Sequence, residues 1–222
     1  MHDDELWAAV DDRRRSVVDL LTDLSPAQWQ QPSLCAGWSV RDVAAHLSMQ
    51  PIRPTPGLAL DALRARGSTN RLIRDTARRR AARPTAELVA AIAASVGTHR
   101  PNIGLTVHEA LIDLLVHEQD IALPLGRRVE MPPVPTAAVA SSVWSDADSR
   151  GGRRKLRVFR ADSPHAGFRF VATDTDWAAG TGPEIRGPVG ALLLLLTGRF
   201  VALGQVEGDG AKMLAKSMRA GH

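Results

Sequence analysis

The sequence predicts an α+β protein in which an N-terminal bundle of α-helices is followed by a smaller C-terminal α/β domain. Apolar residues recur at helical spacing through the first part, whereas short strand-like segments occur only in the second. A proline-rich segment, Met131-Pro132-Pro133-Val134-Pro135, separates the two parts and predicts a boundary. A chain of 222 residues can bury a core in each of two domains, which we expect at residues 1–130 and 136–222.

Composition and charge exclude several other classes of protein. The chain is 44% hydrophobic and 23% charged, which is typical of a globular protein, and its net charge of +4 argues only weakly for nucleic acid. Cys35 is the single cysteine and the first residues lack the apolar core of a secretory signal, so we expect a cytoplasmic location. The longest apolar run, residues 191–196, falls far short of the roughly 20 residues of a membrane span.

The N-terminal part is predicted to begin with three helical segments. An apolar stripe at spacings of three, four and seven predicts a helix over residues 5–24. Ser25-Pro26-Ala27-Gln28 combines an N-cap, a first-turn proline and a capping-box glutamine, and predicts a short helical turn. After an irregular loop, Ser39 is expected to cap a helix over residues 40–49 that ends before Pro51.

Three further helices complete the predicted bundle. Residues 58–80 and 87–96 are helical by composition and spacing, and Pro84 separates them. The clearest helix in the chain spans residues 106–123 and is ended by Pro124 and Gly126.

The C-terminal part mixes predicted strands and helices. Residues 155–160 and 168–172 are strand candidates. Pro188 and Gly198 bracket a buried helix that includes residues 192–196, and Asp209 is expected to cap a last helix.

Positive charge gathers between residues 58 and 84. The arginines there are Arg64, Arg66, Arg71, Arg74, Arg78, Arg79, Arg80 and Arg83. We favour a solvated helix face, because the segment has no aromatic residues for base stacking and no nucleic-acid-binding motif. Contact with an anionic small molecule and binding of nucleic acid are the alternatives that the run leaves open, and of these we rank nucleic acid last.

A line of ligand-type residues crosses the helix predicted over residues 106–123. Glu109, Asp113 and His117 follow one another at intervals of four, and Asp120 comes three residues later, so all four share one face. Most other residues of this helix are apolar. The polar line is therefore either an ordinary solvent-facing stripe or part of a site.

His46 lies on the flank of the apolar stripe of its own predicted helix, where a lone histidine is more often a hydrogen-bonded core residue than a ligand. Together with Asp113 and His117, however, it would give a divalent metal two imidazoles, one carboxylate and an open fourth position. This set suits zinc, and the residue types also allow iron, nickel or manganese.

Three segments resemble one known family. Residues 29–47, WQQPSLCAGWSVRDVAAHL, and residues 114–126, LLVHEQDIALPLG, strongly resemble two signatures of the mycothiol-dependent maleylpyruvate isomerase family. A third similarity runs from ATDTDW at residues 172–177 to LTGR at residues 196–199. The resemblance covers most of the chain and implies a DinB-like four-helix bundle, up-down with a long connection, before a small α/β domain.

The resemblance also implies a metal site. In the family, a histidine of the first signature and an acidic residue and a histidine four apart on the later helix hold the metal, and the matching positions are His46, Asp113 and His117. The family pattern has glutamate where this chain has Asp113. The shorter side chain would require a helix shift, a bridging water, or a ligand from Glu109 or Asp120.

By the same resemblance we expect a divalent metal, with zinc as the expected ion, and mycothiol as thiol cofactor or co-substrate. The implied reaction is either cis-trans isomerisation of a small unsaturated dicarboxylate or transfer of the thiol onto a small electrophile. In the isomerase version, sulfur adds to a conjugated double bond, rotation follows, and elimination returns the other isomer. The alternative is a non-catalytic metal- or small-molecule-binding protein of the same fold, which the aspartate at position 113 favours.

Other residues are weaker candidates. Cys35 is expected to pack in the loop before Gly37, because free cysteine is among the most buried residue types. Arg186 and Arg199 are candidates for binding a substrate carboxylate.

Overall fold

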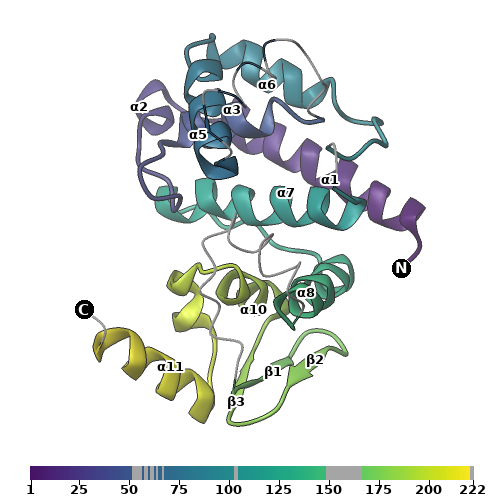
Figure 1. Ribbon diagram of the computed structural model, residues 1–222, viewed down its shortest axis with the longest axis vertical. Helices are drawn as coiled ribbons and strands as arrows, with labels where there is room; N and C mark the ends of the chain where they lie inside the picture. Colours follow the sequence, from purple (N-terminus) through teal and green to yellow (C-terminus); the bar gives the residue numbers. More distant parts are fainter. Residues whose placement is uncertain are drawn as a thin grey trace. The chain divides into compact units, whose positions relative to one another are not determined.

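The computed structural model describes residues 1–51, 57, 60, 63, 65, 66, 68–102, 105–148 and 167–220. The chain forms two compact units, Met1–Val129 and Glu130–His222, and each is described by itself (Figure 1). The first unit is helical where it is described, and the second combines helices with a small sheet. The α+β class is confirmed in this form, whereas the four-helix topology and the independence of the two predicted domains stay predictions.

The helices of the first unit follow the predicted order. They are α1 (Asp3–Thr22), α2 (Pro26–Trp29), α3 (Val40–Leu47), α5 (Thr69–Arg80), α6 (Thr85–Ala93), α7 (Val107–Ala122) and the 3-10 helix η1 (Leu123–Leu125). Helix α7 packs against both α1 and α3, and α6 also contacts these two helices. The buried apolar faces of α1, α3 and α7 thus form a shared core.

Local start and stop signals set the helix ends. Ser25 and Ser39 accept hydrogen bonds from the backbone N–H groups of Gln28 and Asp42, as the predicted capping boxes require. Gly126 follows η1 with a left-handed φ of 67°, a conformation that glycine adopts without steric cost.

The continuous helix predicted over residues 58–80 is wrong in one respect. Arg66 has a left-handed φ of 50°, and the Ser68 hydroxyl accepts a hydrogen bond from the backbone N–H of Arg71, so α5 begins only at Thr69. Much of residues 58–67 lies outside the described parts of the chain.

Two arginines of α5 form hydrogen bonds with residues that flank α3. Arg78 donates to the carbonyl of Gly37 at 3.2 Å, and Arg80 donates to the Ser48 hydroxyl at 3.1 Å. Part of the arginine run therefore fixes α5 beside α3 instead of forming an uninterrupted solvated face.

The second unit contains a three-stranded sheet with helices. Its elements are α8 (Pro133–Asp148), β1 (Arg169–Ala172), β2 (Ala178–Gly180), β3 (Glu184–Gly187), α10 (Val189–Leu196), the 3-10 helix η3 (Phe200–Gln205) and α11 (Asp209–Ala220). The strand order is β2-β1-β3, with β1 antiparallel to β2 and parallel to β3. Helix α10 contacts α8, β1 and β3, so its aliphatic side chains form the centre of this unit.

One feature of the second unit differs from the sequence predictions. The prolines at 132, 133 and 135 were interpreted only as a boundary, yet α8 begins at Pro133. Prolines are tolerated in a first helical turn because the backbone N–H groups there have no intrahelical acceptor. The predicted strand over residues 168–172 is confirmed as β1, while the one over residues 155–160 lies outside the described residues.

Aromatic residues fix α8 on the sheet. Trp144 meets Phe170 of β1 edge to face, with ring centroids 5.7 Å apart, and the indole N–H of Trp177 donates to the Ser141 hydroxyl at 2.9 Å. Gly180 has a φ of 84°, and a side chain there would collide with the Trp144 ring. Within the described parts of the chain, no helix combines the length and apolarity needed to cross a bilayer.

Candidate metal centre

Helix α7 carries most of the predicted ligands and begins with a capped first turn. The backbone N–H of Thr106 donates to the Glu109 carboxylate at 2.7 Å, and the Thr106 hydroxyl binds the same carboxylate. Glu109 therefore accepts hydrogen bonds from donor groups at the N-terminus of α7. Neither group of potential metal ligands in the described residues includes it.

Helix α3 brings His46 to the site. Val40, Val43, Ala44 and Leu47 bury one face of this helix, and His46 is itself only 7% exposed. The Trp38 ring meets the His46 ring edge to face, with centroids 5.8 Å apart. This packing holds the imidazole toward α7 instead of toward solvent.

The three predicted ligands converge. The Nε2 atom of His46 lies 3.4 and 3.2 Å from the two carboxylate oxygens of Asp113, and Nε2 of His117 lies 3.3 Å from one of them. Their ligand atoms all lie within 4.8 Å of one another. The aspartate thus reaches both imidazoles without a further methylene group.

These separations fit a small divalent ion. Tetrahedral zinc ligands at about 2.0–2.2 Å from the ion lie roughly 3.3–3.6 Å from one another. The carboxylate-to-imidazole separations of 3.2 to 3.4 Å are close to this spacing. Two imidazoles and one carboxylate also match the donor types that zinc prefers in proteins.

The same three groups perturb one another electrostatically. Burial raises the pKa of Asp113, but the charges and hydrogen bonds of His46 and His117 outweigh it and hold that pKa far below its usual value. Burial lowers the pKa of His117, yet Asp113, Asp120 and Cys35 together raise it well above its usual value. A cation between these groups is therefore favoured, whether a proton or a metal.

Two residues near the centre were not predicted as part of it. Gln50 donates through its amide to Asp113 and lies four residues after His46, a spacing that could have indicated a shared face. Cys35 was expected only to pack, but its thiol lies 3.0 Å from the Asp120 carboxylate and 3.6 Å from Nδ1 of His117. No local sequence signal indicates this contact, because the loop joins α7 only in the folded chain.

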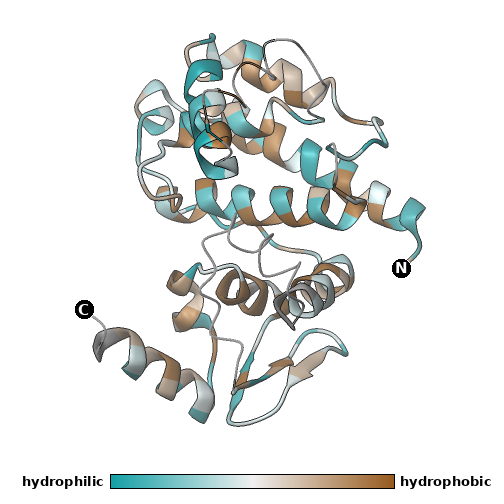
Figure 2. Cartoon of the chain, viewed as in Figure 1, coloured by the Kyte–Doolittle hydropathy of each residue, from teal (hydrophilic) through white to brown (hydrophobic). Residues whose placement is uncertain are grey.

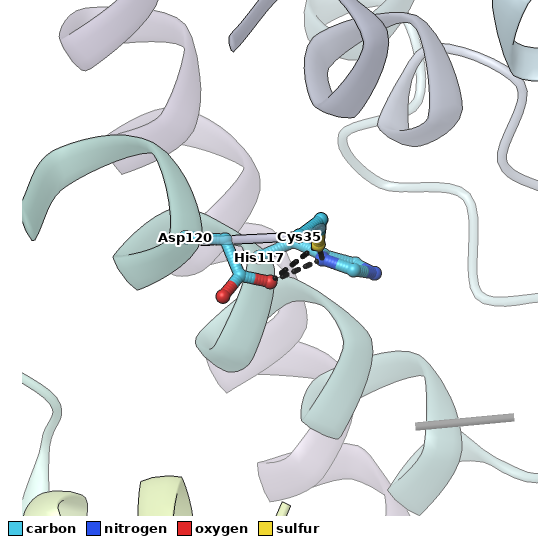
Figure 3. A group of neighbouring side chains, drawn as sticks. All are labelled: Cys35, His117 and Asp120. Carbon is cyan, nitrogen blue, oxygen red and sulfur yellow. Dashed lines mark hydrogen bonds and ion pairs between the residues drawn. The ribbon is translucent and has the colours of Figure 1, made fainter. Parts of the chain in front are cut away.

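Cys35, His117 and Asp120 form a second group whose ligand atoms lie close together (Figure 3). His117 belongs to both groups, with Nε2 facing Asp113 and Nδ1 lying 2.8 Å from Asp120. Asp120, predicted as an alternative metal ligand, therefore approaches His117 at the ring nitrogen that faces away from Asp113.

Arg186 and Arg199 lie in the second unit. Arg186 is an exposed residue of β3 whose guanidinium lies 3.1 Å from Glu184, and Arg199 donates to the Thr197 carbonyl at 2.6 Å. Substrate binding by either arginine stays a prediction.

Sequence and structure comparisons place the chain in a family. The pattern of the mycothiol maleylpyruvate isomerase N-terminal domain matches residues 10–122, just over half of the chain. The chain belongs to the mycothiol-dependent maleylpyruvate isomerase family. No curated protein sequence matches it.

Solved structures agree on the fold. The crystal structure of a mycothiol-dependent maleylpyruvate isomerase is similar with a TM-score of 0.63 and 12% sequence identity, covering 95% of this chain and 94% of that one. A histidine-to-alanine mutant of such an isomerase matches with a TM-score of 0.51, 11% identity and the same coverage. These similarities show that the chain has the fold of this isomerase.

Proposed function

We propose that the protein binds a divalent metal, with zinc as the proposed ion, through His46, Asp113 and His117, and uses mycothiol as its thiol. The observation that carries this proposal is the convergence of three ligand-type atoms from two helices at zinc-like separations. The similar isomerase is described as mycothiol-dependent, which supports the choice of thiol. The proposed location is the cytoplasm, as expected from the sequence.

The chain's own residues would prepare the site for an anionic ligand. Asp113 supplies one negative charge and the two imidazoles supply none when neutral, so this set compensates only half the charge of a divalent ion. A bound ion would favour the thiolate form of a coordinated thiol, whose pKa when free is about 8.5. The uncompensated charge favours thiolates and dicarboxylates over neutral ligands.

The proposed reaction is cis-trans isomerisation of a maleylpyruvate-like dicarboxylate or S-transfer of the thiol onto a small electrophile. Gln50 would hold the Asp113 carboxylate, and the edge-to-face contact with Trp38 would hold His46. Besides favouring the thiolate, the site would accelerate the reaction by keeping the electrophile near the sulfur.

The function is tested with zinc-loaded protein, mycothiol and maleylpyruvate, followed by a small electrophile if no isomer forms. We expect turnover that requires both zinc and mycothiol. Activity that survives complete metal removal, or that glutathione supports equally well, would contradict the proposal. Zinc and mycothiol binding without turnover of any electrophile would favour the non-catalytic binding protein.

A variant that removes a proposed ligand is compared with a control variant that removes another histidine. His46→Ala should abolish turnover and metal binding, whereas His108→Ala removes an imidazole from α7 that belongs to neither group of potential ligands in the described residues. Equal losses in both variants would indicate a structural effect instead of a ligand.

A further inference from the structure

The two ring nitrogens of His117 face different carboxylates. Nδ1 lies 2.8 Å from Asp120, which has no exposed surface, and Nε2 lies 3.3 Å from Asp113, whose side chain is 18% exposed. A neutral imidazole carries its single proton on one nitrogen and accepts or ligates through the other. The shorter contact with the more deeply buried carboxylate favours the proton on Nδ1, which leaves the lone pair on Nε2.

Asp120 is itself held by the loop before α3. The Cys35 thiol donates to the same carboxylate oxygen that contacts His117, at 3.0 Å, and the backbone N–H of Leu34 donates to the Asp120 carbonyl at 3.1 Å. Figure 3 shows the thiol and the His117 ring both turned toward one oxygen of Asp120. The loop therefore fixes the position of the carboxylate relative to α7.

His46 has no equivalent support. Its Nδ1 atom is buried without a hydrogen-bond partner among the described residues, whereas its Nε2 faces Asp113. Within the described residues, only His117 of the two histidines of the candidate centre has a carboxylate on the nitrogen that faces away from Asp113. In its neutral form, His117 is thus the histidine whose tautomer the protein sets before any ion arrives.

We propose that Asp120 is a positioning residue that holds His117 in the Nδ1–H tautomer, so that Nε2 is ready to bind the metal, and that Cys35 supports Asp120. This inference deepens the proposed function and rests on it for its effect on metal binding. A carboxylate on the outer nitrogen of a metal-binding histidine fixes the ring and raises its basicity, and removing it typically costs about 10–100-fold in metal affinity. Asp120 is then not a metal ligand.

The competing assignment is a metal held directly by Cys35, His117 and Asp120. Their ligand atoms are also close enough together for one ion. Such an ion would bind His117 through Nδ1 and would need the Cys35 sulfur as thiolate. The two assignments therefore predict opposite tautomers and opposite roles for the thiol.

The direct test is ¹⁵N NMR of the histidine rings in metal-free, full-length protein at a pH where His117 is neutral. We expect the Nδ1–H tautomer in the wild type and a shift toward Nε2–H in Asp120→Asn, since the amide can donate to Nδ1. Asp113→Asn is the matched control and should keep Nδ1–H. An Nε2–H tautomer in the wild type, or an unchanged tautomer in Asp120→Asn, would overturn the proposal.

Metal affinity gives the second readout, measured by competition for zinc with a chromophoric chelator. Asp120→Asn should bind zinc about 10–100-fold more weakly than the wild type. Cys35→Ser keeps a donor to Asp120 and should stay close to the wild type, whereas Cys35→Ala should lose less affinity than Asp120→Asn. Asp120→Asn with wild-type zinc affinity would overturn the positioning role.

Cobalt-substituted protein separates the two assignments. A thiolate-to-cobalt charge-transfer band that disappears in Cys35→Ser would establish Cys35 as a ligand and overturn the proposal, while absence of the band supports it. A wild type that binds no zinc but shows the Nδ1–H tautomer would overturn the proposed function and leave the Asp120–His117 pairing intact. The predicted effect of Asp120 on zinc affinity would then be refuted together with the proposed function.

Discussion

Helices α7 and α10 are both buried within their own units, but for different reasons. Helix α10 buries only aliphatic side chains, whereas α7 also buries five polar ones, Glu109, His117, Glu118, Gln119 and Asp120. Figure 2 shows α10 hydrophobic along its whole length and α7 alternating between hydrophilic and hydrophobic residues. Burying a polar group costs free energy unless the group is paired. Apolar residues at these positions of α7 would avoid that cost. The difference indicates that α10 serves stability and α7 serves function.

Burial of polar groups alone does not mark the site within α7. Glu118 has no exposed surface and pairs with Arg13 of α1 at 3.3 Å, while its second carboxylate oxygen has no hydrogen-bond partner among the described residues. This pair joins two helices without a further ligand-type residue. Asp113 and His117 instead meet His46 from another helix, and this convergence distinguishes the candidate centre.

The largest expected effect comes from removing a ligand on α7. His117→Ala should lower zinc affinity by more than the roughly 10–100-fold expected for an outer partner, because it removes a donor atom itself. The measurement is zinc competition with a chelator, and circular dichroism should show that the helices remain. His108→Ala is the control on the same helix, and wild-type zinc affinity in His117→Ala would refute the ligand assignment.

The corresponding change in α10 should affect stability instead of the metal. Leu192 is fully buried, so Leu192→Ala should lower the free energy of unfolding by about 2–5 kcal/mol through lost burial and the cavity left behind. Zinc bound per folded molecule should not change. Urea unfolding followed by zinc analysis of the folded fraction checks both expectations, and lost zinc affinity would show that the two helices are not separable in role.

A smaller effect on the free energy of unfolding is expected from Glu118→Gln, and this effect should depend on pH. Burial raises the pKa of Glu118 above its ordinary 4.5, although contacts with Ser16 and Arg13 oppose the rise. Above pH 4.5 the unfolded chain loses this proton before the folded protein does, so wild-type stability falls as pH rises toward the folded pKa. The glutamine has no proton to lose.

The stability of Glu118→Gln relative to the wild type should therefore increase across that pH window. Urea unfolding at a series of pH values measures the difference. A relative stability that declines with rising pH would mean that the ion pair with Arg13, and not burial, dominates at this position.

The smallest effect on stability is expected at Arg186 in the second unit. Its exposed pair with Glu184 should contribute less than about 1 kcal/mol, so Arg186→Ala should unfold close to the wild type. If Arg186 binds a substrate carboxylate, the variant should raise KM for the dicarboxylate while kcat changes little. Arg169→Ala, which removes another partner of Glu184, is the matched control, and equal KM values in both variants would reject the role.

Much of the first unit could be predicted because its signals are local. Ser25 and Ser39 stand directly before the helices that they cap, and the spacing of Asp113 and His117 puts both on one helix face whatever lies around them. The break before α5 was missed because the left-handed conformation of Arg66 has no signature in a helix-favouring composition. Helix α8 was missed because prolines suit both a linker and a first helical turn.

The candidate centre could be predicted only in part, because its geometry depends on tertiary contacts. The resemblance identified His46, Asp113 and His117, but the sequence did not show whether the aspartate could reach both imidazoles. At least one Asp113 oxygen lies within 3.4 Å of each Nε2, so no longer side chain is needed. Cys35 is 82 residues from His117 in sequence, and only the docking of its loop on α7 reveals their contact.

The central claim is that α7 and α3 form a metal centre that accepts a thiolate, and calorimetry of zinc-loaded protein tests it most directly. Mycothiol and glutathione are each titrated in two buffers that differ in ionisation enthalpy, with His117→Ala as the control. Our account predicts tighter binding of mycothiol, with heat that depends on the buffer because coordination releases the thiol proton, and loss of this heat in the control. Equal affinity for the two thiols, or mycothiol binding that is unchanged after metal removal, would contradict it.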